Sequence, residues 1–321
     1  MARIVVLDGY TLNPGDNPWD DLARVGDLEV HDRSTLGEIE ERARGADIVV
    51  TNKAPLSAEM IGVLAELRFI AVTATGFNVV DVGAAAARRI PVSNVPSYGT
   101  ESVAQFTLAL VLELASRVGE HDRAVQEGAW NASPDFCFWS TSPVELSGLT
   151  MGVVGFGAIG RRVGGLAHAF GMPVLASGRP GGGREEPGYE PFEWCDVDEL
   201  FSRADVVSLH CPLTADNAGL VSRGRLARMK PGAFLINTAR GPLVDEHALA
   251  DALERGVLRG AAVDVASSEP IASDNPLLSA PRCIVTPHIA WATLAARRRL
   301  MKTTVDNVRA FLAGAPVNVV R

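Results

Sequence analysis

The fold of this 321-residue chain is decided by the stretch Val153-Val154-Gly155-Phe156-Gly157-Ala158-Ile159-Gly160, in which an apolar run ends in three glycines spaced G-x-G-x-x-G. Gly155 permits a tight turn from strand to helix, Gly157 lets the backbone approach a pyrophosphate, and Gly160 lets the helix pack on the strand. Free N–H groups at the start of that helix, near Ala158 and Ile159, are placed to bind phosphate oxygens. The stretch therefore predicts a dinucleotide-binding turn.

The residues on both sides of the glycines support this interpretation. Residues 149–154 form a short apolar run typical of a buried parallel strand. After the turn, Val163, Leu166, Ala167 and Phe170 lie on one face of a predicted helix. This order of strand, turn and helix matters because the chain contains 31 glycines and chance matches to the motif are expected.

Composition and charge restrict the class of protein. An apolar content of 47% with 21% charged residues is typical of a soluble globular protein, and the length suits two domains. The net charge is −8, which predicts no nucleic acid and no membrane as partner. The four cysteines form no C-x-x-C pair, so we expect free thiols, no metal site and a cytoplasmic protein.

Two series of short apolar strands alternate with helical patterns, which predicts parallel sheets covered by helices. The first series contains strands at residues 4–7, 48–50, 69–72 and 91–94, and the second at 149–154, 173–176, 205–209, 233–237, 261–265 and 283–286. Long helices are predicted over 102–118 and 293–312. We therefore predict an α/β protein with two Rossmann-like doubly wound domains, in which residues 100–288 are inserted into a domain formed by 1–99 and 289–321.

Residues 120–148 interrupt this alternation with aromatic residues and prolines, so we expect an irregular arm there. Aromatic side chains exposed on an arm usually mark a surface that meets a partner. We predict that the arm contributes to a homodimer. The alternative is a loop packed on its own domain.

Three chemically capable side chains follow the carboxyl ends of predicted strands, where ligands of open α/β sheets bind. They are Arg240, Glu269 and His288. Each one alone has an ordinary structural explanation, as a surface charge, a turn residue or a loop histidine. Their convergence on the edge that carries the glycine turn instead predicts an active site.

The chain resembles the D-isomer-specific 2-hydroxyacid dehydrogenases along essentially its whole length. The motifs that carry the resemblance are residues 155–160, Asn237 to Asp245, Asp264 to Pro270, and Thr286 to Ile289. Ser133 to Cys137 and Pro287 to Thr293 are most similar to the glycerate dehydrogenase and hydroxypyruvate (glyoxylate) reductase branch. The resemblance implies a flavodoxin-like substrate domain, a dinucleotide-binding domain, and Arg240, Glu269 and His288 as catalytic residues.

These residue types suit the reduction of a 2-keto acid. Histidine has an ordinary pKa of about 6.5, so His288 can donate or accept a proton near neutrality. Glu269 would bind the other ring nitrogen and favour the imidazolium, and Arg240 would hold the substrate carboxylate and polarise the keto oxygen. The substrate-binding residues that the resemblance implies are Thr75, Gly76, Arg240, His288 and Trp291.

The cofactor preference rests on a departure from the family pattern. NAD-dependent members carry an acidic residue at the end of the second strand, where this chain has Ser177-Gly178-Arg179. We therefore expect NADP(H) to be favoured over NAD(H), with Ser177 and Arg179 binding the 2′-phosphate and Asp264 receiving the nicotinamide carboxamide. An exposed arginine in a tolerant loop is the alternative. The expected cofactor-binding residues are Gly155, Gly157, Ala158, Ile159, Gly160, Ser177, Arg179, Cys211, Pro212, Thr238, Ala239 and Asp264.

The sequence thus predicts a reductase that transfers hydride between NADP(H) and a small 2-keto or 2-hydroxy acid such as hydroxypyruvate or glyoxylate. Two alternatives remain open at this point. One is an NADH-dependent glycerate dehydrogenase of the same fold, and the other is a non-catalytic, cofactor-sensing interaction protein.

Overall fold

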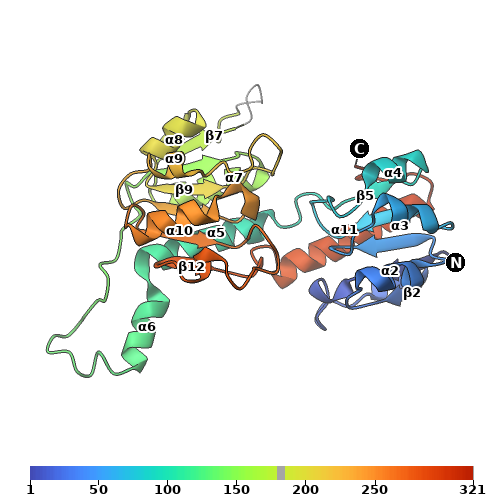
Figure 1. The fold of residues 1–321 in the computed structure, drawn as a ribbon, viewed down its shortest axis with the longest axis horizontal. Helices are drawn as coiled ribbons and strands as arrows, with labels where there is room; N and C mark the ends of the chain where they lie inside the picture. The colour runs from blue at the N-terminus through green and yellow to red at the C-terminus, as the bar shows by residue number, and fades with distance from the viewer. Residues whose placement is uncertain (179–184, 321) are drawn as a thin grey trace. The chain divides into compact units, whose positions relative to one another are not determined.

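The computed structural model describes residues 1–178 and 185–320, and it divides the chain into two compact units (Figure 1). Unit 1 contains Met1–Gly99 and the chain from Ala292 onward, and unit 2 contains Thr100–Trp291. The chain returns to unit 1 at residue 292, whereas we expected the return at residue 289. The predicted fold class of two α/β domains, one inserted in the other, is confirmed.

Unit 1 is built on a five-stranded sheet in the order β2-β1-β3-β4-β5, with every pair parallel. The strands are β1 (Arg3–Val6), β2 (Asp27–Val30), β3 (Ile48–Thr51), β4 (Phe69–Val72) and β5 (Val92–Ser93). This is the flavodoxin-like order. Strand β2 was missed in the sequence because it is an edge strand whose residues are mostly exposed, so it carries no apolar run.

Helices cover both faces of this sheet because successive strand residues point to opposite sides. Val5 packs in a core with Ile39 and Ile61, and Val6 packs in a second core with Val305 and Val308. The carboxyl-terminal helix is therefore part of unit 1. The helices of unit 1 are η1 (Gly9–Thr11), α1 (Asp20–Ala23), α2 (Leu36–Ala43), α3 (Ala58–Val63), α4 (Val82–Ala87) and α11 (Leu294–Leu312).

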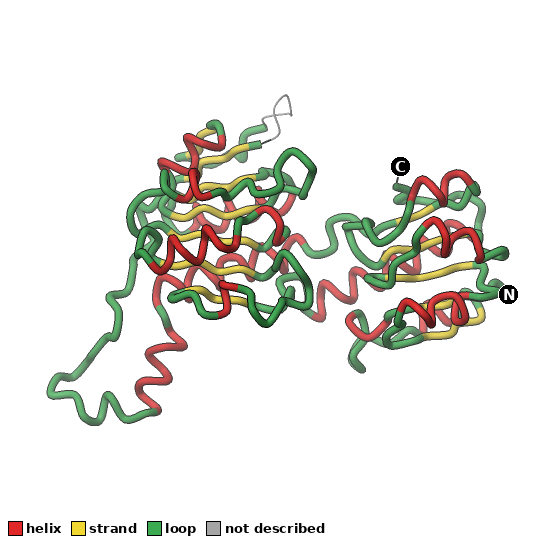
Figure 2. Tube along the Cα trace, in the orientation of Figure 1, coloured by secondary structure: helices red, strands yellow, loops and turns green. Residues whose placement is uncertain are grey.

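Unit 2 is built on a seven-stranded parallel sheet in the order β12-β11-β10-β9-β6-β7-β8 (Figure 2). The strands are β6 (Met151–Val154), β7 (Val174–Ser177), β8 (Phe192–Trp194), β9 (Val206–Leu209), β10 (Phe234–Asn237), β11 (Gly260–Val263) and β12 (Cys283–Val285). Six of them were predicted. Strand β8 was missed because it is a short edge strand of three partly exposed residues.

Two groups of helices enclose the sheet of unit 2. Val153 faces a core with Leu108 and Val163, and Val154 faces a core with Leu200 and Leu249. The strand order reverses between β9 and β6, which is where doubly wound sheets open a ligand crevice. The elements are α5 (Thr100–Ser116), α7 (Ala158–Ala169), α8 (Val197–Arg203), α9 (Arg223–Leu226), η2 (Gly241–Leu243), α10 (Glu246–Glu254) and η3 (Pro276–Leu278).

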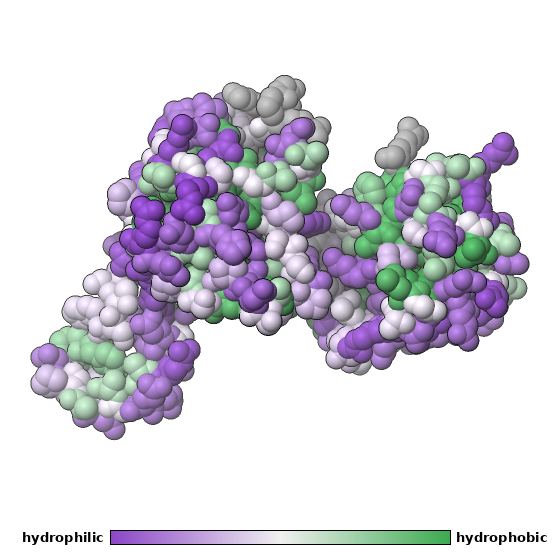
Figure 3. Space-filling model, in the orientation of Figure 1, coloured by the Kyte–Doolittle hydropathy of each residue, from purple (hydrophilic) through white to green (hydrophobic). Residues whose placement is uncertain are grey.

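The arm that was expected to be irregular begins with a helix, α6 (Val118–Gln126). None of its residues is buried, and it contains few large apolar residues that would have indicated a core helix. The loop beyond α6 exposes Trp130, Phe136 and Trp139, and apolar side chains gather at the end of the arm (Figure 3).

Among the described residues no single helix is long and apolar enough to cross a membrane, and α5 with α6 meets that test only as a pair bent by 54°.

Candidate active site

The glycine turn between β6 and α7 shows a steric reason for two of its three glycines. Gly155 has φ +94°, and a Cβ at this position would lie 2.5 Å from the backbone nitrogen of Cys211. A Cβ on Gly160 would lie 2.1 Å from the carbonyl oxygen of Gly155. Both positions therefore require glycine, because real Cβ atoms do not approach backbone so closely.

The third glycine, Gly157, precedes α7 and has no neighbouring atom within 4 Å of its ideal Cβ position. The backbone of Gly157 thus borders open space at the start of α7. The first-turn N–H groups of a helix, here those of Ala158 and Ile159, have no acceptor within the helix. This combination fits a dinucleotide pyrophosphate, because an anion can approach the helix N-terminus without meeting a side chain.

The neighbouring strand ends supply further residues of the predicted cofactor site. Ser177 ends β7, is 7% exposed, and accepts a 2.8 Å hydrogen bond from the N–H of Gly155 through its carbonyl. Cys211 and Pro212 follow β9, and burial raises the pKa of the Cys211 thiol, which keeps it uncharged beside the glycine turn. Arg179, expected to bind a 2′-phosphate, lies outside the described residues.

The turn after β10 is held by Asn237, a residue whose role the sequence did not reveal. The Asn237 side chain donates to the carbonyl of Arg240 at 2.9 Å and accepts from the N–H of Ala239 at 3.0 Å. It is fully buried, so the turn that presents the exposed Arg240 is rigid. Thr238, 9% exposed, shares a 3.0 Å hydrogen bond with Thr107 of α5.

His288 and Glu269, 19 residues apart in sequence, form a direct contact. Nδ1 of His288 lies 2.7 Å from Oε2 of Glu269, and the two side chains are 29% and 34% exposed. The other carboxylate oxygen of Glu269 accepts from the N–H of Ala266 at 3.3 Å. No described residue binds Nε2 of His288, so this nitrogen can exchange a proton with a ligand.

Gly241 explains why the Arg240 turn lies against the chain that leads to Glu269. A Cβ on Gly241 would lie 1.9 Å from the backbone carbon of Ala266, so the two turns are in direct backbone contact. Strands β10, β11 and β12 are neighbours in the sheet, and all three turns follow their carboxyl ends. The structure therefore brings Arg240, Glu269 and His288 to one edge of unit 2.

Asp264, which we predict to receive the nicotinamide carboxamide, is hydrogen-bonded to the segment that follows β12. It is 1% exposed, and its carboxylate accepts hydrogen bonds from the hydroxyl of Thr286 at 2.6 Å and from the N–H groups of Ile289 and Ala290 at 2.9 and 2.8 Å. The geometry thus assigns Asp264 to holding the loop that carries His288.

The predicted substrate-binding residues belong to both units. Thr75 and Gly76 follow β4 in unit 1, where the Thr75 hydroxyl donates to the carbonyl of Val95 at 2.9 Å and Asn94 donates to the carbonyl of Thr75 at 2.7 Å. Trp291 is half-buried at the end of unit 2. The loop of Thr75 is therefore tied down locally, as a backbone anion site requires.

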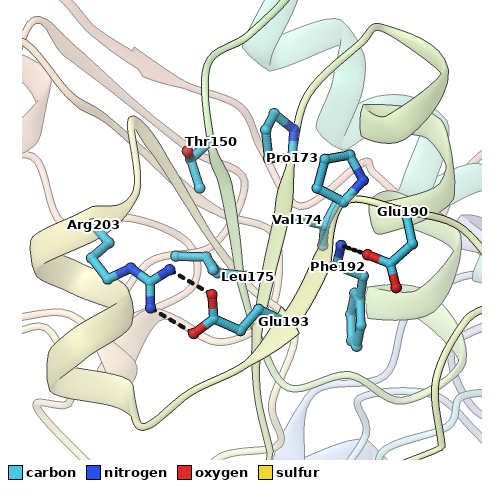
Figure 4. Close-up of a pocket in the computed structure, with 9 residues that line it drawn as sticks. Thr150, Pro173, Val174, Leu175, Glu190, Phe192, Glu193 and Arg203 are labelled. Carbon is cyan, nitrogen blue, oxygen red and sulfur yellow. Dashed lines mark hydrogen bonds and ion pairs between the residues drawn. The ribbon is translucent and has the colours of Figure 1, made fainter.

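A separate hollow of about 250 Å³ lies at the opposite edge of the unit 2 sheet (Figure 4). Its lining comes from the amino ends of β6, β7 and β8 and from α8, whereas Arg240, Glu269 and His288 follow the carboxyl ends of β10, β11 and β12. Arg203 in this hollow is committed to Glu193 by two hydrogen bonds of 2.7 and 2.6 Å. The hollow is therefore not part of the candidate active site.

No group of three His, Cys, Asp or Glu side chains that could hold a metal occurs among residues 1–178 and 185–320.

Comparison with known proteins agrees with the family resemblance seen in the sequence. Residues 108–290 match the family described as "D-isomer specific 2-hydroxyacid dehydrogenase, NAD binding domain". The chain is 48% identical over 323 residues to a hydroxypyruvate reductase of Blautia hydrogenotrophica, covering 99% of each protein. It is 41% identical to a glycerate dehydrogenase of Methylorubrum extorquens, covering 89% of each.

Solved structures with the same fold hold either nicotinamide dinucleotide. An acyclic imino acid reductase in complex with NADPH and D-Arg is 30% identical with a TM-score of 0.86, covering 99% of this chain and all of that one. The D-lactate dehydrogenase of Aquifex aeolicus, complexed with NAD and lactic acid, is 30% identical with a TM-score of 0.84, covering 97% and 96% of the two chains.

Proposed function

Because the chain belongs to the D-isomer-specific 2-hydroxyacid dehydrogenase family, we propose that it reduces hydroxypyruvate and glyoxylate with His288 as its acid–base catalyst. The family assignment makes the protein an oxidoreductase of small 2-hydroxy and 2-keto acids that uses a nicotinamide dinucleotide. The observation that carries the finer proposal is the 2.7 Å contact between His288 and Glu269, which leaves Nε2 of His288 available.

The nicotinamide, when bound, supplies the hydride that adds to C2 of the keto acid. His288 then donates the proton from Nε2 to the keto oxygen, so that no free alkoxide is formed. Glu269 accepts the Nδ1 hydrogen bond, which holds the ring and favours its protonated form before the transfer. In the oxidation direction His288 takes the same proton back.

Arg240 supports this step electrostatically. Its guanidinium is always charged and carries donors in a forked arrangement, so it can bind the substrate carboxylate while polarising the keto oxygen. The buried Asn237 amide keeps the turn beneath it rigid. We propose that the backbone N–H groups of Thr75 and Gly76 bind the same carboxylate, and that Trp291 lines the substrate pocket.

We further propose that NADP(H) is favoured over NAD(H). The described end of β7 offers the small, mostly buried Ser177 and no carboxylate, so nothing there repels a 2′-phosphate. Arg179 would then provide the charge-assisted contacts to this phosphate. The first-turn N–H groups of α7 and the open space over Gly157 would accept the pyrophosphate of either dinucleotide.

Initial-rate kinetics test the proposal. Rates would be measured with NADH and NADPH against hydroxypyruvate, glyoxylate, pyruvate and phenylpyruvate. A higher kcat/KM with hydroxypyruvate or glyoxylate and with NADPH supports the proposal. A preference for NADH supports the alternative of an NADH-dependent glycerate dehydrogenase, and absence of turnover with cofactor binding intact supports a non-catalytic interaction protein.

The arm supports a proposed homodimer. Trp130, Phe136 and Trp139 are 52%, 88% and 61% exposed, and α6 buries no residue of its own. Large aromatic side chains gathered on an extended segment gain stability when a second surface covers them. Light scattering at several protein concentrations would report the oligomeric state. We expect the protein to act in the cytoplasm, in keeping with its four free cysteines.

A further inference from the structure

The chain passes between the two units at residues 99–100 and again at residues 291–292. A buried hydrogen bond lies just inside unit 2 at these two crossings. The hydroxyl of Ser102, in the first turn of α5, donates to the carbonyl of Ala290 at 2.8 Å. Ser102 and Ala290 are 4% and 3% exposed, so water does not compete for this bond. The segment that enters unit 2 is thereby tied to the segment that leaves it.

Both backbone polar groups of Ala290 are hydrogen-bonded. Its carbonyl accepts from Ser102, and its N–H donates to the buried carboxylate of Asp264 at 2.8 Å. The same carboxylate accepts from Ile289 at 2.9 Å. Two buried side chains, one from α5 and one from the end of β11, therefore restrict the backbone directly after His288.

The restricted backbone directly follows His288, whose φ is +54°. A residue other than glycine rarely adopts this left-handed conformation, and it persists only where the surroundings determine the backbone. The hydrogen bond from the His288 N–H to the carbonyl of Thr286, at 3.0 Å, fixes the loop before the ring in the same way. The direction of the imidazole toward Glu269 thus depends on groups that never touch the ring.

We propose that Ser102 is a positioning residue for the active-site histidine and acts together with Asp264 through the backbone of residues 289–290. The inference rests on the proposed role of His288 in proton transfer. Displacing a catalytic group by about 1 Å lowers the rate as much as about 100-fold. Loss of one of several loop contacts should cost less, and we expect about a 5- to 30-fold lower kcat.

The test compares Ser102→Ala, which removes the donor, with Ser102→Thr, which keeps it. We expect Ser102→Ala to lower kcat while the Kd of the reduced cofactor, measured by fluorescence titration, stays within about twofold. Ser102→Thr should retain most of the activity. Ser102→Cys, nearly isosteric with a weaker donor, serves if the alanine variant does not fold. The matched control is Thr304→Val, which removes a buried hydroxyl that donates to Leu300 at 2.9 Å within α11 of unit 1.

A double-mutant cycle with His288→Ala separates this inference from the proposed function. If Ser102 acts through the histidine, Ser102→Ala has no further effect on the residual rate of the His288→Ala variant. An equal loss in both backgrounds, or an unchanged kcat in Ser102→Ala alone, overturns the positioning role of Ser102. Near-normal turnover of His288→Ala instead overturns the proposed function on which the inference rests.

Discussion

Replacing Glu269 by glutamine tests the centre of the proposed mechanism with a very small change in shape. The carboxylate lies 2.7 Å from Nδ1 of His288, and its second oxygen accepts from Ala266 at 3.3 Å. Glutamine keeps an acceptor for the ring nitrogen and removes the negative charge. The variant therefore changes how strongly the protonated ring is favoured and leaves the architecture of the loop in place.

The magnitude follows from the exposure of the pair. A charge-assisted hydrogen bond in a buried site contributes about 1.5–3 kcal/mol. The side chains of His288 and Glu269 are 29% and 34% exposed, and solvent reduces such a contribution toward the value of about 1 kcal/mol found for exposed pairs. Since about 1.4 kcal/mol corresponds to a tenfold change in rate, we expect kcat for hydroxypyruvate reduction to fall by about 3- to 10-fold in Glu269→Gln.

The assay is the rate of hydroxypyruvate reduction at saturating substrate and cofactor, measured from about pH 5 to about pH 9. Glu246→Gln is the matched control, because Glu246 accepts from Ser267 and Asn275 in the same region and has no contact with the histidine. A Glu269→Gln profile that superimposes on the wild type would refute the reasoning. An equal loss of rate in Glu246→Gln would also do so, since the effect would then be general.

Four further substitutions test the site and the fold. His288→Ala should lower kcat by about 10²- to 10⁴-fold with little change in cofactor affinity, and near-normal turnover would remove His288 from its role. Arg179→Ala should raise the KM for NADPH by about 10- to 150-fold with little effect on the KM for NADH. Ser177→Asp should shift the preference further toward NADH. Equal weakening of both cofactors by Arg179→Ala would contradict the 2′-phosphate site. Burial lowers the pKa of His210 to about 3 in the folded protein. As the pH falls, the unfolded chain therefore binds a proton on this histidine before the folded protein does. The free energy of unfolding should consequently decrease below about pH 6.5, by at most about 1.4 kcal/mol per pH unit. Urea unfolding of His210→Asn at several pH values should show a flatter dependence, and a slope equal to that of the wild type would contradict this account.

The sequence by itself determined the features that depend on local periodicity and local sterics. Buried strands appear as apolar runs, which is why six strands of unit 2 were predicted. The glycine turn was recognised from the local order of apolar strand, G-x-G-x-x-G and helix, in which Gly155 has a positive φ and Gly160 packs against the backbone of Gly155. Arg240, Glu269 and His288 were placed at one edge because parallel strands end together.

Only the tertiary structure decided the features that lack a buried face or that depend on distant partners. Strands β2 and β8 and helix α6 are short and contain no fully buried residue, so no continuous apolar run marks them. Packing of the sheet brings Glu269 into contact with His288. Packing of α5 brings Ser102 to the carbonyl of Ala290, which lies 188 residues further along the chain. Asp264 shows the same limit, since its position at a strand end was evident in the sequence and its partners were not. A buried polar group must form its hydrogen bond with a group that packing brings near it, and packing depends on the whole unit rather than on any one segment.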